Sequence, residues 1–108
     1  VEDIVVIVHT DTGHVGYGEA PATAVITGDT HGSIVEAVGK FIRPRLIGQD
    51  IANLNRITDL IQTALERNTS AKAAVEIAVY DLWAQLYDAP LYKMLGGGDP
   101  VITTDITI

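Results

Sequence analysis

The chain has 108 residues, of which 47% are hydrophobic and 19% are charged, so it fits one compact domain and is not globally disordered. Seven basic against fourteen acidic side chains give a net charge of −7, which repels phosphate backbones and anionic membranes and excludes nucleic acid and membrane surfaces as expected partners. Because the chain has no cysteine, it can form no disulfide and no thiolate metal site. The sequence shows neither the basic start of a signal peptide nor the apolar run of about 18 residues of a membrane-spanning helix, so the expected location is the cytoplasm.

The chain opens with a predicted β-hairpin. Strand-like runs at 4–10 and 14–20 flank the turn residues Asp11-Thr12-Gly13. Two strands alone are only marginally stable in water, so a helix layer or a third strand is expected to cover them. The segment from Pro21 to Asp29 then mixes proline, glycine and threonine with apolar side chains, which predicts a connecting loop with exposed apolar tips.

Two amphipathic helices are predicted after this loop. Apolar residues recur at helical spacing over 34–42, and Pro44 is expected to end that helix. A second helical pattern covers 54–65, with Asp50 or Asn53 as its N-cap.

A third, longer helix and a final strand complete the pattern. Ser70 is the expected N-cap of the helix, and a stripe of small apolar residues over 71–86 permits close approach of a neighbouring element. After a short turn at 91–95, the residues 96–100 (GGGDP) mark a boundary. The alternating sequence VITTDITI at 101–108 predicts a strand that opens a second domain. Two strands followed by three helices indicate an α+β fold.

The remaining polar residues point to no reaction. His9, His14 and His31 lack the spacing that places metal ligands on one helix face, so they are interpreted as surface or turn residues. Glu19 has no second carboxylate near it in the sequence and is interpreted as a loop-capping or ion-paired group.

Three stretches carry a resemblance to a known family. In order and spacing, TDTGHVGYGEA at 10–20, SAKAAVEIAVYDLWAQ at 70–85 and APLYKMLGG at 89–97 resemble the N-terminal capping domain of the enolase superfamily, in its muconate-lactonizing-enzyme-like branch. The loop APATAVITGDT at 20–30 resembles, more narrowly, that of dipeptide epimerases acting on L-Ala-D/L-Glu. The resemblance implies a β-hairpin or meander followed by a three-helix layer.

The resemblance also implies a division of the chain. Residues 1–97 would form the capping domain, and 98–108 would begin a truncated (β/α) barrel as its first strand. The family's cap opens with another strand and a mobile loop before the position of Val1, so both are expected to be missing.

The chemistry that the resemblance implies lies outside these residues. In this family a proton α to a carboxylate or amide is removed, and the resulting enolate is held by Mg²⁺. The lysine acids and bases and the carboxylate metal ligands belong to later barrel strands. This chain is therefore expected to supply no catalytic residue and no Mg²⁺ ligand, and to be inactive alone. Its expected partners are the dipeptide substrate, its own barrel and further copies of the full-length enzyme.

The loop over the barrel mouth is the part of the cap expected to contact substrate. Ile26 is the first candidate for an apolar contact with the N-terminal residue of the dipeptide, followed by Thr23 and Val25. Asp105 and Thr107 are further candidates, because active sites of such barrels lie at the carboxyl ends of the strands. The competing interpretation of Ile26 is that it packs into the core of the cap.

Two alternatives to a dipeptide epimerase remain open. The same scaffold serves muconate cycloisomerases and N-acylamino acid racemases, which would differ in the closing loop. The second alternative is that the chain is a non-catalytic α+β binding module. Such a module is expected to pair the strand at 101–108 internally.

Overall fold

The structure, a computed structural model, describes residues 2–107 and begins with the predicted hairpin. The strands β1 (Glu2–His9) and β2 (Val15–Ala22) pair antiparallel, with Val6 opposite Gly18. They are the only sheet within the described residues. At the ends away from the turn, both strands are two residues longer than the sequence predicts. The loop after β2 therefore begins at Thr23 instead of Pro21.

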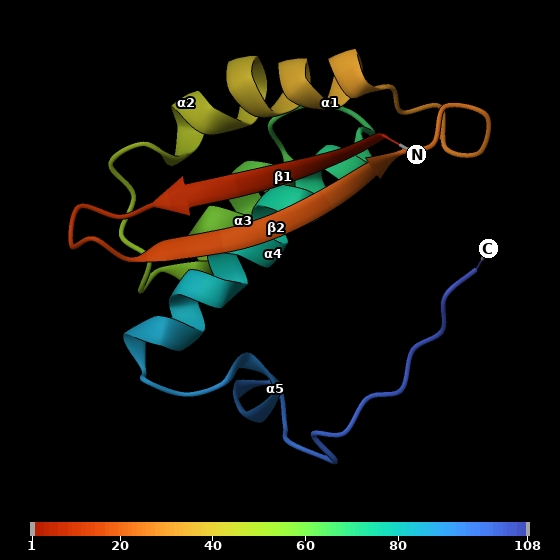
Figure 1. Cartoon of the computed structure of the whole chain (residues 1–108). Helices are drawn as coiled ribbons and strands as arrows, with labels where there is room; N and C mark the ends of the chain where they lie inside the picture. Colours follow the sequence, from red (N-terminus) through yellow and green to blue (C-terminus); the bar gives the residue numbers. More distant parts are fainter. Residues whose placement is uncertain (1, 108) are drawn as a thin grey trace.

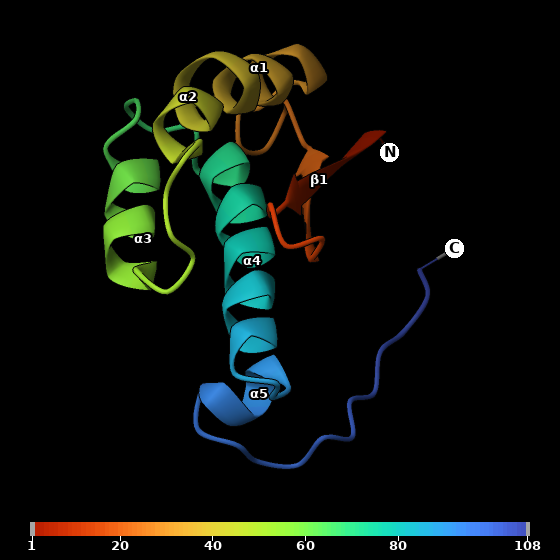
Figure 2. The same ribbon diagram turned by 90° about the vertical axis from the view of Figure 1, so that its left-hand side faces the viewer.

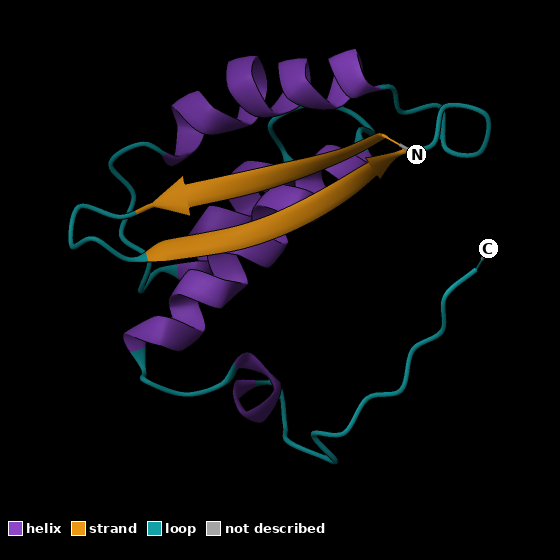
Figure 3. Cartoon of the chain, viewed as in Figure 1, coloured by secondary structure: helices purple, strands orange, loops and turns teal. Residues whose placement is uncertain are grey.

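Two helical segments pack against the strands and a third packs behind them, which confirms the predicted α+β class. Figure 1 shows α4 crossing one face of the sheet, with a helical rod made of α1, η1 and α2 beside β1. Figure 2 shows α3 beside α4, on the side away from the strands. Figure 3 shows the helices in purple, the strands in orange and the connecting loops in teal. The helical bounds are α1 (His31–Glu36), the π-helical η1 (Ala37–Ile42), α2 (Arg43–Leu46), α3 (Leu54–Gln62), α4 (Thr69–Leu86) and α5 (Leu91–Met94).

The contact between β2 and α4 depends on two glycines. A Cβ atom at Gly18 would overlap the carbonyl oxygen of Ala74, and one at Gly16 would overlap the carbonyl oxygen of Ala78. The Cβ atom added at Gly16 would also lie 2.8 Å from Cγ of Leu82. Backbone therefore packs against backbone here, as the small-residue stripe of the third helix predicts. The largest fully buried side chains of the core are Ile34, Ile42 and Ile61.

The prediction that Pro44 ends the first helix is wrong. The helical rod continues through Pro44 to Leu46 because the proline follows closely on η1, whose wider register replaces the i→i−4 bonding that a proline would interrupt. Before it, η1 takes the wider i→i+5 register, in which the Arg43 N–H donates to the Val38 carbonyl.

One of the predicted helix caps is confirmed in position, and another needs correction. Asn53 precedes α3 but caps it without a side-chain hydrogen bond, while Asp50 Oδ1 accepts from the Ala52 N–H in the preceding turn. Helix α4 begins two residues earlier than expected, at Thr69, after Asn68, whose φ of 50° is left-handed. Ser70 is therefore not the N-cap, and its hydroxyl serves another partner.

The segment after α5 does not form the predicted strand. Residues 99–107 have no regular structure, and Figure 1 shows them leaving the body of the fold as an extended trace. A strand requires backbone partners, and no described residue pairs with 101–107. Its apolar side chains Val101, Ile102 and Ile106 are consequently exposed. The last residue of the predicted strand, 108, lies outside the described residues.

No helix among residues 2–107 has both the length and the apolar character needed to cross a lipid bilayer.

Candidate functional site

The loop between β2 and α1, residues 23–30 and hereafter the closing loop, is a hydrogen-bonded turn. The N–H groups of Ile26 and Thr27 both donate to the Thr23 carbonyl, at 2.9 and 2.8 Å, and the Gly28 N–H donates to the Ala24 carbonyl at 3.1 Å. The hydroxyls of Thr23 and Thr27 lie 3.0 Å apart at its base. Gly28 ends the turn with a φ of +82°, a conformation that favours glycine. The loop is therefore held in one conformation by its own hydrogen bonds.

Two apolar side chains project from this turn into solvent. Val25 is 98% exposed and Ile26 is 81% exposed, so the interpretation that Ile26 packs into the core is wrong. Figure 1 shows the loop extending beyond the strands, at the end of the sheet where β1 begins. Exposed apolar residues held on a rigid turn are suited to contact a ligand or another domain.

Both ends of the closing loop are fixed to regular structure. At its start, β2 is paired with β1 up to Ala22. At its end, Thr30 caps α1 in a capping box: the Ser33 N–H donates to Thr30 Oγ1 and the Thr30 N–H donates to Ser33 Oγ. Between them, the nearly buried Asp29 accepts a hydrogen bond from Ser70 of α4.

The structure does not bring the two predicted halves of the site together. Asp105 and Thr107 lie in the unpaired segment after α5, and both are exposed. Within the described residues, no hydrogen bond or ion pair joins 101–107 to the closing loop, and Figures 1 and 2 both show the two segments apart. A substrate contact by either residue stays a prediction.

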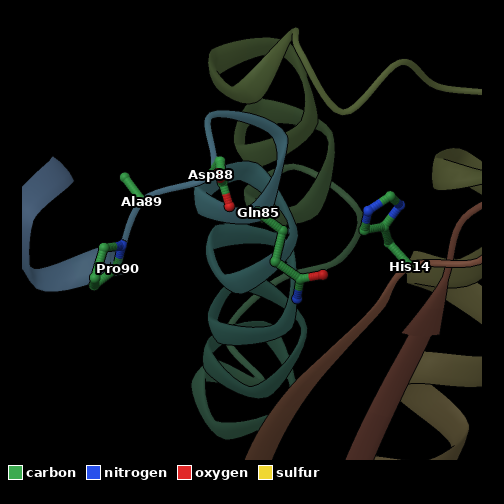
Figure 4. A pocket seen from close by; sticks show the side chains of 5 residues that line it. All are labelled: His14, Gln85, Asp88, Ala89 and Pro90. Carbon is green, nitrogen blue, oxygen red and sulfur yellow. The ribbon is translucent and has the colours of Figure 1, made fainter.

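A shallow pocket lies near the hairpin turn, at the opposite end of the sheet from the closing loop. Figure 4 shows its side chains, which come from the hairpin turn, from the last turns of α4 and from the connection between α4 and α5. The open space has a volume of about 380 Å³. Two of its polar side chains are bonded within the chain: His14 Nδ1 lies 3.0 Å from Thr12 Oγ1, and Gln85 Nε2 donates to the Val15 carbonyl at 2.9 Å. The lining residues are His14, Gln85, Asp88, Ala89 and Pro90.

The described residues do not fit a magnesium site. Between residues 2 and 107, no three His, Asp or Glu side chains are grouped so that they could hold a metal ion. Mg²⁺ prefers several oxygen ligands in near-octahedral geometry, and no carboxylate cluster supplies them here.

Sequence reasoning missed the two residues that tie the closing loop to the body of the fold. Ser70 has the identity and position of a helix cap, and Asp29 looks like ordinary loop polarity. Their pairing spans 41 residues, so no local pattern reveals it. An acidic residue at the end of an otherwise uncharged loop was the one available signal.

Comparison with known proteins places this geometry in a family. Residues 2–96 match the family described as mandelate racemase / muconate lactonizing enzyme, N-terminal domain. An L-Ala-D/L-Glu epimerase of Clostridium acetobutylicum is 48% identical over 108 residues, which is 100% of this chain and 30% of that protein. The chain thus spans less than a third of the length of this relative.

Solved structures agree with the sequence match. The substrate-liganded L-Ala-D/L-Glu epimerase from Bacillus subtilis is 49% identical, with a TM-score of 0.86 over 88% of this chain and 26% of that chain. The dipeptide epimerase from Cytophaga hutchinsonii, complexed with Mg and the dipeptide D-Ala-L-Val, is 33% identical, with a TM-score of 0.82 over 92% of this chain and 27% of that chain. The chain therefore belongs to the mandelate racemase / muconate lactonizing enzyme family and corresponds to its N-terminal domain.

Proposed function

We propose that this chain is the capping part of a dipeptide epimerase that inverts a carbon α to a carboxylate in L-Ala-D/L-Glu or a similar dipeptide. In this proposal residues 1–97 form the cap, and 98–108 begin the barrel. The observation that carries it is the 48% identity to an L-Ala-D/L-Glu epimerase along the whole chain, closing loop included.

The cap contributes shape and exclusion of water rather than acid–base chemistry. Val25 and Ile26 stand on a preformed turn, where they would cover the barrel mouth and contact the apolar end of the dipeptide. Burying one isoleucine side chain is worth about 1.5–3 kcal/mol, enough for one such contact to affect substrate choice. The Thr23 hydroxyl lies 3.0 Å from the Thr27 hydroxyl and keeps acceptor capacity, so Thr23 would contact substrate through its methyl group or by accepting a hydrogen bond.

The remaining groups of the site belong to the barrel in this proposal. Asp105 and Thr107 would face the substrate once residues 101–108 are paired as the first barrel strand. Proton transfer and Mg²⁺ binding are assigned to polypeptide outside residues 2–107, since the described residues offer no ligand set for the ion. The full-length enzyme is expected to form a homo-oligomer.

The test uses the full-length polypeptide that contains this chain. Incubation with L-Ala-L-Glu in D₂O should exchange the α-proton of the glutamate residue and yield L-Ala-D-Glu, both measured by NMR. Parallel incubations with muconate and with N-acylamino acids test the alternative members of the family. Turnover of one of these in place of the dipeptide would overturn the substrate assignment, and turnover of the dipeptide by the isolated 108-residue chain would overturn the capping role.

A further inference from the structure

The hydrogen bond between Asp29 and Ser70 is short and lies in a largely buried position. The Ser70 hydroxyl donates to Asp29 Oδ2 at 2.7 Å, and Asp29 is only 8% exposed. A hydroxyl-to-carboxylate bond of this length is charge-assisted and stronger than a neutral one. An ionised carboxylate at this depth is costly to bury unless such a partner is present. The pair therefore contributes more than a surface contact would.

This bond is the only tertiary hydrogen bond of the closing loop in the described part of the chain. Every other hydrogen bond made by residues 23–30 joins groups at most four residues apart, within the turn or the first turn of α1. Asp29 reaches 41 residues along the chain to the start of α4. Within the described residues, this side-chain pair is thus the one hydrogen bond that joins the closing loop directly to α4.

The pair is connected to the apolar tips through Thr27. The Asp29 N–H donates to Thr27 Oγ1 at 3.3 Å, and that same hydroxyl donates to the Thr23 carbonyl at 3.2 Å, at the base of the turn. The chain of contacts thus runs from Ser70 through Asp29 and Thr27 to the turn that carries Val25 and Ile26.

We propose that Asp29 and Ser70 are positioning residues that hold the closing loop in its substrate-covering conformation. They do not touch the substrate, and they act by reducing the number of conformations that the loop has to give up when substrate binds. This inference rests on the proposed function, because it is the dipeptide whose binding the loop would favour.

A loop released from α4 should weaken substrate binding more than it slows turnover. Ordering a mobile loop on binding consumes part of the binding free energy, so KM should rise while kcat stays within about twofold. In the full-length enzyme, Ser70→Ala leaves the Asp29 carboxylate without its donor, and we expect about a tenfold rise in KM for L-Ala-L-Glu.

Companion variants separate the hydrogen bond from the charge. Asp29→Ala should also raise KM, and the double variant should be no worse than Ser70→Ala, because all three lack the same bond and only Ser70→Ala leaves the carboxylate without its donor. Asp29→Asn keeps an oxygen acceptor for the Ser70 hydroxyl and should restore most of the loss. Asp50→Ala is the matched control, since Asp50 also accepts one hydrogen bond in a connecting segment but does not contact the closing loop.

Hydrogen–deuterium exchange of the peptide spanning 23–28 gives a readout that does not depend on activity. The amides of Ile26, Thr27 and Gly28 are hydrogen-bonded within the turn, so their exchange should quicken in Ser70→Ala and not in Asp50→Ala. Unchanged exchange in Ser70→Ala overturns the proposal, as does a lowered melting temperature with KM and kcat equal to those of the unmodified enzyme. If the unmodified enzyme does not interconvert Ala-Glu epimers, the proposed function fails, and the exchange rates alone decide whether the pair positions the loop.

Discussion

Replacing Gly18 with alanine should destabilise the fold because it forces β2 away from α4. The added Cβ would overlap the Ala74 carbonyl oxygen and lie 2.8 Å from the Ala74 carbonyl carbon. Both sides of this contact are backbone, so no flexible side chain is available to move aside. Overpacking typically costs about 1–3 kcal/mol, and a backbone clash belongs at the upper end of that range. Alanine recovers about 0.5–1 kcal/mol of backbone entropy, which leaves a net loss of about 2 kcal/mol.

Gly39→Ala is the matched control for this substitution. Gly39 lies within η1, and a Cβ atom there meets nothing within 4 Å, so alanine should raise the free energy of unfolding by about 0.5–1 kcal/mol.

Urea unfolding of the 108-residue chain provides the assay for both variants. Trp83, the single tryptophan of the chain, lies on α4 between Tyr80 and Tyr87 and reports on that helix by fluorescence. With a urea dependence of about 2 kcal/mol per M, the midpoint should fall by about 1 M for Gly18→Ala and rise by about 0.3–0.5 M for Gly39→Ala. A Gly18→Ala midpoint equal to or above that of the unmodified chain would refute the close-contact argument.

Three further outcomes are expected. In the full-length enzyme, Ile26→Asp should raise KM for L-Ala-L-Glu by about ten- to a hundredfold with little change in melting temperature, because this exposed side chain supports no core; a large loss of stability would contradict that role. In urea unfolding, Ile61→Ala should lower the free energy of unfolding by about 2–5 kcal/mol because Ile61 is fully buried. Ile47→Ala, at an exposed position, should change it by no more than about 0.5 kcal/mol. Equal losses in the two variants would contradict the assigned core. Millimolar Mg²⁺ should leave the melting temperature of the 108-residue chain unchanged, because residues 2–107 offer no ligand set, and a rise that saturates with Mg²⁺ would reveal a site in this chain.

Local patterns predicted the elements of this fold well, because each pattern reflects a choice that the chain makes over a few residues. Alternation and turn residues located the hairpin, and the small-residue stripe anticipated the contact of α4 with Gly16 and Gly18. The errors arose where a residue has two permitted roles. A proline in the interior of a helix usually ends it. At Pro44 the helical rod continues, because the π-helical register of η1 directly precedes this residue.

The candidate site was less accessible from sequence because its support is not local. The apolar tips of the closing loop were predicted at Val25 and Ile26, and the structure leaves both exposed. The partner of Asp29 depends on how α4 lies against the hairpin, which no short window of sequence encodes. The alternation at 101–107 likewise predicts which side chains share a face but supplies no neighbouring strand.

If the closing loop contacts substrate as proposed, the exposure of Val25 and Ile26 has a consequence for how readily the cap changes its specificity. The turn beneath these side chains is held by backbone groups and by the threonine hydroxyls at its base, so the tips contribute almost nothing to folding. Substitutions at the two positions are thus free to alter the shape presented to a ligand without a penalty in stability. Selection for new substrates would find tolerated mutations here sooner than in the tightly packed strand and helix behind them.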